Sequence, residues 1–454
     1  MHTKTFFRFD RKQRAHFLVN VVVGVLIAMI FTLTASSQWG EELMNAAFDL
    51  LVRYENYNAS NSAQGSNPLY FVEITPTEYR QWGEPLITPR DRLSNLIETA
   101  WKKGAPVVAL DILLDRPDHE NPAGDVKLRR LLEKMLRENA RTQVVFPVRV
   151  GADGNLRHHL LDDLLEQKTA DGRRIFYPAV PTALASEGDL LNRFWGMYQV
   201  ARDQVGHTKV IWSVPLLVAT LHTGSEAHLE EAANALIAAT EHASGDARAA
   251  GPYIKLGKGE IHLPQLQRRD LPGTDHPIFV EGESHGLSYT QRVRFLIPPE
   301  TSARRDAGNF RSDLSPDSLA GKIVVIGNGS SETGDILSTP VGRMPGMYFI
   351  GNAINTIVTG QMPVHLNIWL HYAVEFLIIL VAALIFLHLH SIIAQIFLSA
   401  VFLLIFFPIS WYIYREWGLF FNFIIPVAAM RLHSIADDIE SAFATRGRKH
   451  HEQH

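Results

Sequence analysis

Four apolar runs interrupt an otherwise mixed sequence. The first run is Phe17–Ala35, and three more crowd between Leu366 and Leu432. Runs of this length and apolarity are typical of transmembrane helices. The pattern therefore predicts a membrane anchor at both ends of a large aqueous domain, residues 36–365.

The flanking charges predict the orientation of these spans. Before the first run, at residues 1–16, a single acidic residue, Asp10, stands among basic ones: Lys4, Arg8, Arg11, Lys12 and Arg14. Because basic flanks stay in the cytoplasm, we expect a cytoplasmic amino terminus and an extracytoplasmic domain. Three further spans, in 366–432, would return the tail, 433–454, to the cytoplasm. We place them at Ile368–Leu387, Ile392–Tyr414 and Leu419–Leu432; the last is short and contains Pro426.

A cleaved signal peptide is the competing interpretation of the amino terminus. The small residues Thr34–Ser37 would suit a cleavage site. The apolar run before them is longer than a usual signal-peptide core, which favours an uncleaved anchor.

Strand and helix patterns alternate within the aqueous domain. Three apolar runs predict buried strands, at Leu69–Ile74, Val107–Leu114 and Gln143–Val150. The segments between them have helical apolar faces, and we expect the first helix to be capped by Thr88 and to begin at Pro89. Strand, helix and strand in this order predict an α/β fold with a mixed or mostly parallel sheet flanked by helices.

The later part of the domain continues this pattern after an interruption. Further strands are expected at Arg292–Ile297 and Lys322–Gly327, followed by a helix at Met347–Thr359. Residues 222–276 look like an insertion, with an amphipathic helix at Glu226–Ala243.

Composition excludes several functional classes. The net charge of −4 gives no long basic field, so we expect no nucleic-acid partner. The chain has no cysteine, which excludes disulfides and thiolate chemistry. No Ser-His-Asp spacing, zinc motif or phosphate loop is present, so we predict no enzyme, no cofactor and no metal site. We expect the pair His158 and His159 to be exposed to solvent.

Several short motifs resemble one known family. They are Phe48–Arg53, Trp82 before Thr88-Pro89-Arg90, Gly104-Ala105 before Leu110–Leu113, Gly321–Gly327, Gly334-Asp335, Thr339–Gly342, Met344–Gly346 and Asn352–Ile354. Together they resemble the type-2 CHASE domain, an extracellular sensory module associated with bacterial cyclases and histidine kinases. The resemblance covers about 36–365, is weakest near 222–276, and extends to the three apolar runs that follow.

The resemblance implies a multi-pass protein of the bacterial inner membrane that acts in signal transduction. The cyclase or kinase usual in the family is missing after the last apolar run, so we expect a separate cytoplasmic effector. The alternative is a scaffold whose outer domain docks other envelope proteins without switching. Either role is compatible with a homo-oligomer, and a periplasmic enzyme lacks any supporting residues.

Acidic residues suggest a ligand site at one edge of the sheet. Asp111 follows an apolar strand, where open α/β sheets bind ligands. With Asp115, Asp118 and Asp335 it could form an acidic pocket or cation site, and we name Arg90, Asp111 and Asp335 as candidate ligand-binding residues. The structural alternative is that Asp111 accepts loop amides or pairs with Arg90 or Arg116.

A glycine-containing turn follows the strand at Lys322–Gly327. Its backbone amides could hold an anion, although Gly327, Gly329 and Gly334 do not match the dinucleotide fingerprint. A loop that needs positive φ angles is the favoured explanation.

Two further sets of residues are candidates for signal transmission. His371 and Glu375 lie one helical turn apart in an apolar run and could form a switch, or Glu375 could simply extend to the lipid headgroups. Ile435, Ile439 and Phe443 recur every fourth residue and could contact a cytoplasmic partner; the alternative is a frayed tail.

Overall fold

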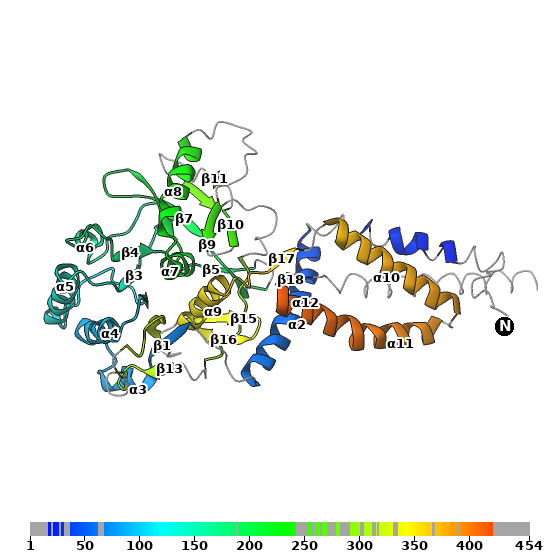
Figure 1. Ribbon diagram of the computed structural model, residues 1–454, viewed down its shortest axis with the longest axis horizontal. Helices are drawn as coiled ribbons and strands as arrows, with labels where there is room; N and C mark the ends of the chain where they lie inside the picture. The colour runs from blue at the N-terminus through cyan, green and yellow to red at the C-terminus, as the bar shows by residue number, and fades with distance from the viewer. Residues whose placement is uncertain are drawn as a thin grey trace, which may run out of the picture. The chain divides into compact units, whose positions relative to one another are not determined.

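The computed structural model describes most of the aqueous domain and parts of the flanking segments (Figure 1). The described residues are 17–19, 21–26, 29–30, 37–61, 68–186, 189–241, 253–256, 259–263, 266–269, 278–281, 291–299, 304–310, 315, 317–329, 335–365, 368–388 and 391–420. The chain divides into two compact units. The larger unit is Val52–Met362, and the smaller combines Met1–Leu51 with Pro363–His454.

A six-stranded sheet forms the centre of the larger unit. Every pairing between its neighbouring strands is parallel. This confirms the predicted α/β class and the mostly parallel sheet. In spatial order the strands are β13 (Arg304–Asp306), β1 (Leu69–Ile74), β14 (Ile323–Asn328), β2 (Val107–Asp111), β3 (Gln143–Pro147) and β4 (Phe176–Ala179).

Helices cover both faces of this sheet, as Figure 1 shows. On one face lie α4 (Arg90–Lys102) and α5 (Pro122–Arg137), whose leucines share a buried core with Val72, Val108 and Val324. On the other face lie α7 (Val214–Thr223) and α9 (Gly346–Val358). Burial on both faces explains why the strands are apolar runs without alternation.

Helix α9 packs tightly on β1. The ring of Phe71 stacks on Tyr348, with ring centroids 4.9 Å apart. A Cβ atom on Gly351 would overlap the Phe71 ring, so only glycine permits this approach. This contact fixes α9 against β1, the strand that neighbours β14 in the sheet.

Smaller elements complete the larger unit. Its remaining helices are α3 (Pro76–Gln81), α6 (Asp162–Leu165) and α8 (Glu226–Glu241), together with the end of α2 (Gln38–Asn61). Its antiparallel pairs are β5 (Ala183–Ala185) with β6 (Asn192–Trp195), β7 (Tyr198–Arg202) with β8 (Thr208–Trp212), β9 (Tyr253–Leu256) with β10 (Gly259–His262), β11 (Leu266–Arg269) with β12 (Ile278–Glu281), and β15 (Ile336–Thr339) with β16 (Gly342–Pro345).

Two local predictions were wrong. Helix α4 begins at Arg90 with Pro89 at the N-cap position, and no side chain caps it, so Thr88 does not have the predicted role. Residues 292–297 do not form a strand; only an isolated bridge joins Arg292 to Phe194. Backbone groups of Arg294, Phe295 and Ile297 are bound instead by side chains of α2 and α9.

The smaller unit contains the apolar segments. Its described elements after residue 362 are β17 (Val364–His365), α10 (Ile368–His388), α11 (Ser391–Val401), the π-helical turn η3 (Phe402–Phe406), α12 (Phe407–Trp417) and β18 (Leu419–Phe420). Phe48 of α2 packs against Tyr414 and Phe420, with ring centroids 5.3 Å and 4.8 Å away.

Among the residues that the structure describes, no helix combines the length and apolarity needed to cross a membrane. Much of the predicted first span and most of the predicted last span lie outside these residues. The four transmembrane helices therefore stay predictions.

Candidate functional site

The carboxyl ends of three parallel strands meet at one edge of the sheet. Glu73 of β1 is paired in register with Gly327 of β14, which in turn is paired with Asp111 of β2. Leu110 belongs to the core under α4 and α5, so Asp111, the next residue, lies on the α9 side. Acidic side chains are thus placed where open α/β sheets bind ligands.

Glu73 is buried in a satisfied polar network. Only 4% of the residue is exposed; its Oε2 accepts a hydrogen bond from the Tyr348 hydroxyl at 2.6 Å and lies 2.7 Å from Nε of Arg304. Burial raises the pKa of the Glu73 carboxyl, and the Tyr348 hydrogen bond opposes this shift. Because both partners come from the protein, Glu73 is held as a structural group that fixes α9 and β13 to β1.

The glycines after β14 serve close packing at this edge. Neither Gly327 nor Gly329 has a positive φ angle, so that expectation was wrong for both. A Cβ on Gly327 would lie 2.8 Å from Cβ of Met347, and one on Gly329 would overlap the Glu73 carboxylate. Gly334, the third glycine of the predicted turn, lies outside the described residues.

Asp111 and Asp335 share a hydrogen bond at the same edge. Burial, followed by the nearby charge of Asp335, raises the pKa of Asp111 to about 8. Burial also raises the pKa of Asp335, while the hydrogen bond from Asp111 lowers it. The shifts indicate that Asp111 holds the shared proton at neutral pH and that the two groups titrate as a pair.

The structure brings only part of the predicted acidic cluster together. Asp118 accepts hydrogen bonds from the backbone of Glu120 and Asn121 at 3.1 and 3.0 Å, and Asp115 lies 3.7 Å from Arg149. Arg90 faces Asp125 at 3.8 Å, among the residues under α4 and α5. The described residues contain no group of three side chains that could hold a metal ion.

The two neighbouring histidines differ in their surroundings. His158 is exposed and its Nδ1 lies 2.8 Å from Asp162, as expected for a surface residue. His159 is only 2% exposed and packs edge-on against Phe146, so the expectation of exposure was wrong for this residue. Burial lowers the pKa of His159 to about 4, so its imidazole is neutral at physiological pH.

The predicted transmission residues are not placed by the structure. His371 and Glu375 fall one turn apart on α10, but their side chains lie outside the described part of the chain. Ile435, Ile439 and Phe443 also lie outside it. Their roles stay predictions.

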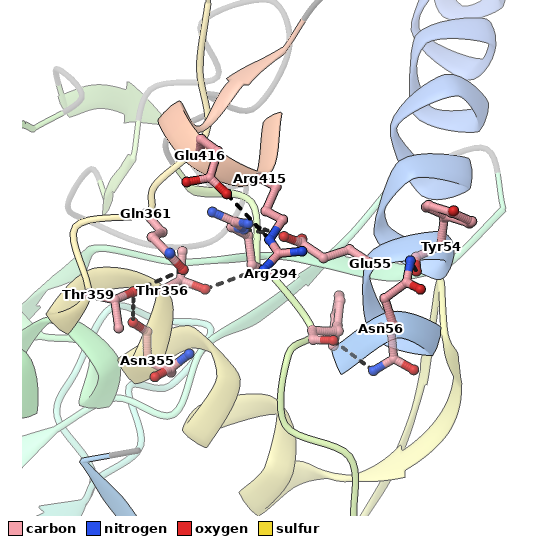
Figure 2. A network of polar contacts seen from close by, with 12 residues as sticks. Tyr54, Glu55, Asn56, Arg294, Asn355, Thr356, Thr359, Gln361, Arg415 and Glu416 are labelled. Carbon is pink, nitrogen blue, oxygen red and sulfur yellow. Dashed lines mark hydrogen bonds and ion pairs between the residues drawn. The ribbon is translucent and has the colours of Figure 1, made fainter. Parts of the chain in front are cut away.

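A buried polar clasp, absent from the sequence predictions, joins α2 to α9. We define the clasp as Glu55, Asn56, Arg294, Asn352 and Thr356. Figure 2 shows its α2 end, where the Arg294 guanidinium binds the Glu55 carboxylate through two hydrogen bonds. Glu55 is 5% and Arg294 1% exposed, so this ion pair is removed from solvent.

The backbone between these residues completes the clasp. The side-chain amide of Asn56 donates to the backbone oxygen of Phe295 at 2.7 Å, and the backbone N–H of Arg294 donates to the Thr356 hydroxyl at 3.0 Å (Figure 2). The Asn352 side chain accepts from Ile297 N at 2.8 Å and donates to Ile297 O at 2.9 Å. Residues 294–297 are therefore held between α2 and α9 by side chains in place of a neighbouring strand.

A model of the CHASE2 domain matches residues 22–388, more than half of the chain. The chain belongs to the CHASE2 domain family. CHASE2 is an extracellular sensory domain, which confirms the predicted resemblance and supports a sensory role. A search of curated proteins and a search of solved structures each gave no match.

The shared proton predicts how the stability of the CHASE2 domain depends on pH. The pKa of Asp111 is raised in the folded state, so its protonation stabilises the fold fully below about pH 4, and this contribution is lost as the pH rises through about 8. We expect the unfolding free energy to fall between pH 5 and 8, with a slope of up to about 1.4 kcal/mol per pH unit from one proton.

Asp111→Asn removes the titrating group and keeps a donor for Asp335. Thermal unfolding midpoints measured from pH 5 to 8 should therefore vary less in this variant than in the wild-type protein. Asp163→Asn, at an exposed carboxylate whose pKa is lowered mainly by its hydrogen bonds with Arg129, is the control and should keep the wild-type pH profile above pH 5. Equal slopes in Asp111→Asn and wild type would contradict the shared proton.

Proposed function

We propose that the chain is a membrane-anchored extracytoplasmic sensor that binds a ligand at the carboxyl edge of its sheet and acts through a separate cytoplasmic protein. The observation that carries the sensory part is the CHASE2 match over residues 22–388. The ligand, the membrane location and the partner are parts of the proposal.

Exposed apolar side chains support the membrane anchor. The smaller unit has many large hydrophobic side chains exposed on its surface. They lie on the first apolar run and on α10, α11, η3 and α12. They include Leu18, Val22, Leu26, Ile30, Trp369, Leu370, Phe376, Leu377, Ile393, Ile396, Phe397, Leu404, Ile405 and Ile409. Soluble proteins rarely expose apolar patches of such extent, whereas a lipid bilayer solvates them. We propose that these residues contact the bilayer of the bacterial inner membrane.

The clasp supports a route for the signal. Helix α2 begins at Gln38, directly after the first apolar run, and α9 is followed within ten residues by α10, which starts at Ile368. Both helices are thus connected by short chain segments to the proposed spans. Because the clasp binds α2 and α9 to one backbone segment, a shift of either helix moves the other, as a two-state signal requires.

The contact between Asp111 and Asp335 supports a ligand-responsive site at the carboxyl edge of the sheet. Asp335 accepts the backbone hydrogen bond of Gly346 at 3.1 Å, and its carboxylate lies against Gly346 at the start of α9. A change in the charge of Asp111 or Asp335 therefore acts on the first turn of α9, whose amino-terminal amides favour a negative neighbour. We propose that Asp111 and Asp335 belong to the ligand-responsive edge.

The membrane orientation can be tested by reporter fusions. An enzyme that is active only outside the cytoplasm should be active when fused near Asp153 or Gly282 and inactive after His454, because four spans place both termini inside. Enzyme activity after His454 would mean that the chain crosses the membrane an odd number of times before that point, and the short span at Leu419–Leu432 would be removed from the proposal.

Cysteine crosslinking tests whether the clasp controls the spans. The natural chain has no cysteine, so introduced pairs report without background. Within the smaller unit Gly24 lies against Ile379, since a Cβ on Gly24 would be 2.6 Å from Cγ2 of Ile379. We expect oxidative crosslinking between Gly24→Cys and Ile379→Cys, and we expect Glu55→Gln to change its rate severalfold. The reason is that an uncompensated buried Arg294 costs about 3–5 kcal/mol unless the clasp opens.

The control for Glu55→Gln is Asp163→Asn. It removes the carboxylate of an exposed pair with Arg129, which stabilises the fold little. Its crosslinking rate should equal that of the cysteine pair alone. If Glu55→Gln also leaves the rate unchanged at normal folded protein levels, the clasp transmits nothing and the scaffold alternative is favoured.

A further inference from the structure

At the carboxyl edge of the sheet, on the side covered by α4 and α5, several buried hydrogen-bond donors have no hydrogen-bond acceptor within the described part of the chain. Arg90, the first residue of α4, is 1% exposed, and its Nη2 donates to Leu113 O at 3.3 Å. Its Nε and Nη1 atoms have no hydrogen-bond partner in residues 68–186, which are described without a gap, or elsewhere among the described residues. A buried donor without an acceptor is costly, so such atoms indicate a missing partner.

His159 contributes a third donor of this kind. Its Nδ1 accepts a hydrogen bond from Leu161 N at 3.2 Å, which leaves the proton of the neutral imidazole on Nε2. The Nε2 atom is buried and also lacks a partner among the described residues. All three nitrogens are therefore donors. Arg90 Nε has the Asp125 carboxylate 3.8 Å away, so Arg90 Nη1 and His159 Nε2 are the donors for which a further acceptor is argued.

Backbone contacts place both side chains at one turn. Arg90 donates to the carbonyl of Leu113, and Leu160 N, next to His159, donates to the carbonyl of Leu114 at 2.8 Å. Leu113 and Leu114 follow β2, so the turn lies at the carboxyl end of the sheet. We define the Arg90 donor cluster as Arg90 Nε and Nη1 together with His159 Nε2.

Two helix amino termini meet at the same place. Neither α4, with 13 residues, nor α5, with 16, has a side chain that caps its first turn. They approach closely, because a Cβ on Gly124 of α5 would lie 3.4 Å from Cβ of Arg90. Uncapped helix amino termini add partial positive charge and favour an anion at this point.

Nearby carboxylates limit the charge of that anion. Asp125 Oδ1 lies 3.8 Å from Arg90 Nε and, among the described residues, has no hydrogen-bond partner of its own. The other Asp125 oxygen accepts from Asp118 N at 2.8 Å. Asp115, Asp118 and Arg116 also act electrostatically on Arg90. With Arg149 beside Asp115, three carboxylates face three guanidinium groups, so the surroundings offer no net positive charge to a dianion such as phosphate. A single carboxylate matches the planar donors of arginine.

We propose that the Arg90 donor cluster binds the carboxylate group of a small monocarboxylic acid. This inference rests on the proposed sensory function for its biological meaning and names the chemical class of its ligand. The bound carboxylate accepts from Arg90 and His159 at the junction of α4, α5 and the turn after β2.

Direct titration tests the proposal. The full chain in lipid nanodiscs is titrated with sodium acetate and sodium propionate, and separately with inorganic phosphate, at constant ionic strength and pH 7. Calorimetry measures the dissociation constants. We expect saturable binding of acetate or propionate and no comparable binding of phosphate.

Conservative variants assign the binding to the cluster. His159→Asn keeps an acceptor for Leu161 N and removes the Nε2 donor, so it should weaken binding by about tenfold, the equivalent of one lost hydrogen bond. Arg90→Lys keeps the charge and removes the planar donors, and should weaken binding at least as much. The matched controls are His158→Asn and Arg129→Lys, both at exposed residues, and should bind as the wild type does.

Three results would overturn the proposal. The first is the absence of saturable acetate and propionate binding, which would assign the donors to buried water. The second is tighter binding of phosphate than of acetate or propionate. The third is wild-type affinity for acetate or propionate in folded His159→Asn. Failure of Arg90→Lys to fold leaves His159→Asn as the deciding variant. If acetate or propionate binds at the cluster but leaves the crosslinking of positions 24 and 379 unchanged, the carboxylate site stands and the sensor proposal fails.

Discussion

The buried ion pair between Glu55 and Arg294 is the contact on which the arrangement of α2 and α9 in the larger unit depends. The two residues are 239 positions apart in sequence, and both are withdrawn from water. Removing two charges from water is costly, so the pair persists only in a geometry that satisfies both groups. The two hydrogen bonds between the guanidinium and the carboxylate provide that geometry. Residues 294–297 are thereby fixed in one position between α2 and α9.

Helix α9 links this clasp to the edge of the sheet. Its first residue, Gly346, lies against Asp335, while Tyr348 binds Glu73 and Thr356 binds the backbone of Arg294. A helix is stiff over this length, so a displacement at its first turn reaches the clasp within the same element. The proposed input and the proposed output thus share one rigid helix that is buried against β1 and β14.

The two sides of the carboxyl edge have opposite chemistry. On the α9 side Asp111 and Asp335 share a proton, and on the α4 side Arg90 and His159 present donors. The side on which a residue lies follows from strand alternation, since Leu110 faces α4 and Asp111 faces α9. In the proposed function, the carboxyl edge therefore responds to protonation on one side and to an anionic ligand on the other, at two sites that do not overlap.

The central strands were predictable because each is a local apolar run. Leu69–Ile74 matches β1 residue for residue, and Lys322–Gly327 differs from β14 by one residue at each end. Family membership was likewise predictable from short motifs in the sequence. Residues 292–297 were mistaken for a strand, since their pattern does not show that side chains from α2 and α9 would bind their backbone.

The parts of the site that were missed depend on contacts distant in sequence. The burial of His159 follows from packing on Phe146, and the glycines at 327 and 329 are explained by Met347, Asp111 and Glu73. Arg90 and Asp111 were grouped as candidates, yet the structure places them on opposite sides of the sheet, with Arg90 facing Asp125. No local pattern in the sequence carries this information.

The coupling free energy between Glu55 and Arg294 tests the account most directly. It is obtained from a double-mutant cycle of Glu55→Gln and Arg294→Met, with chemical unfolding of the detergent-solubilised chain followed by tryptophan fluorescence. A buried pair that organises the clasp predicts a coupling of about 2 kcal/mol or more. A coupling below about 0.5 kcal/mol, the range of independent sites, would contradict it.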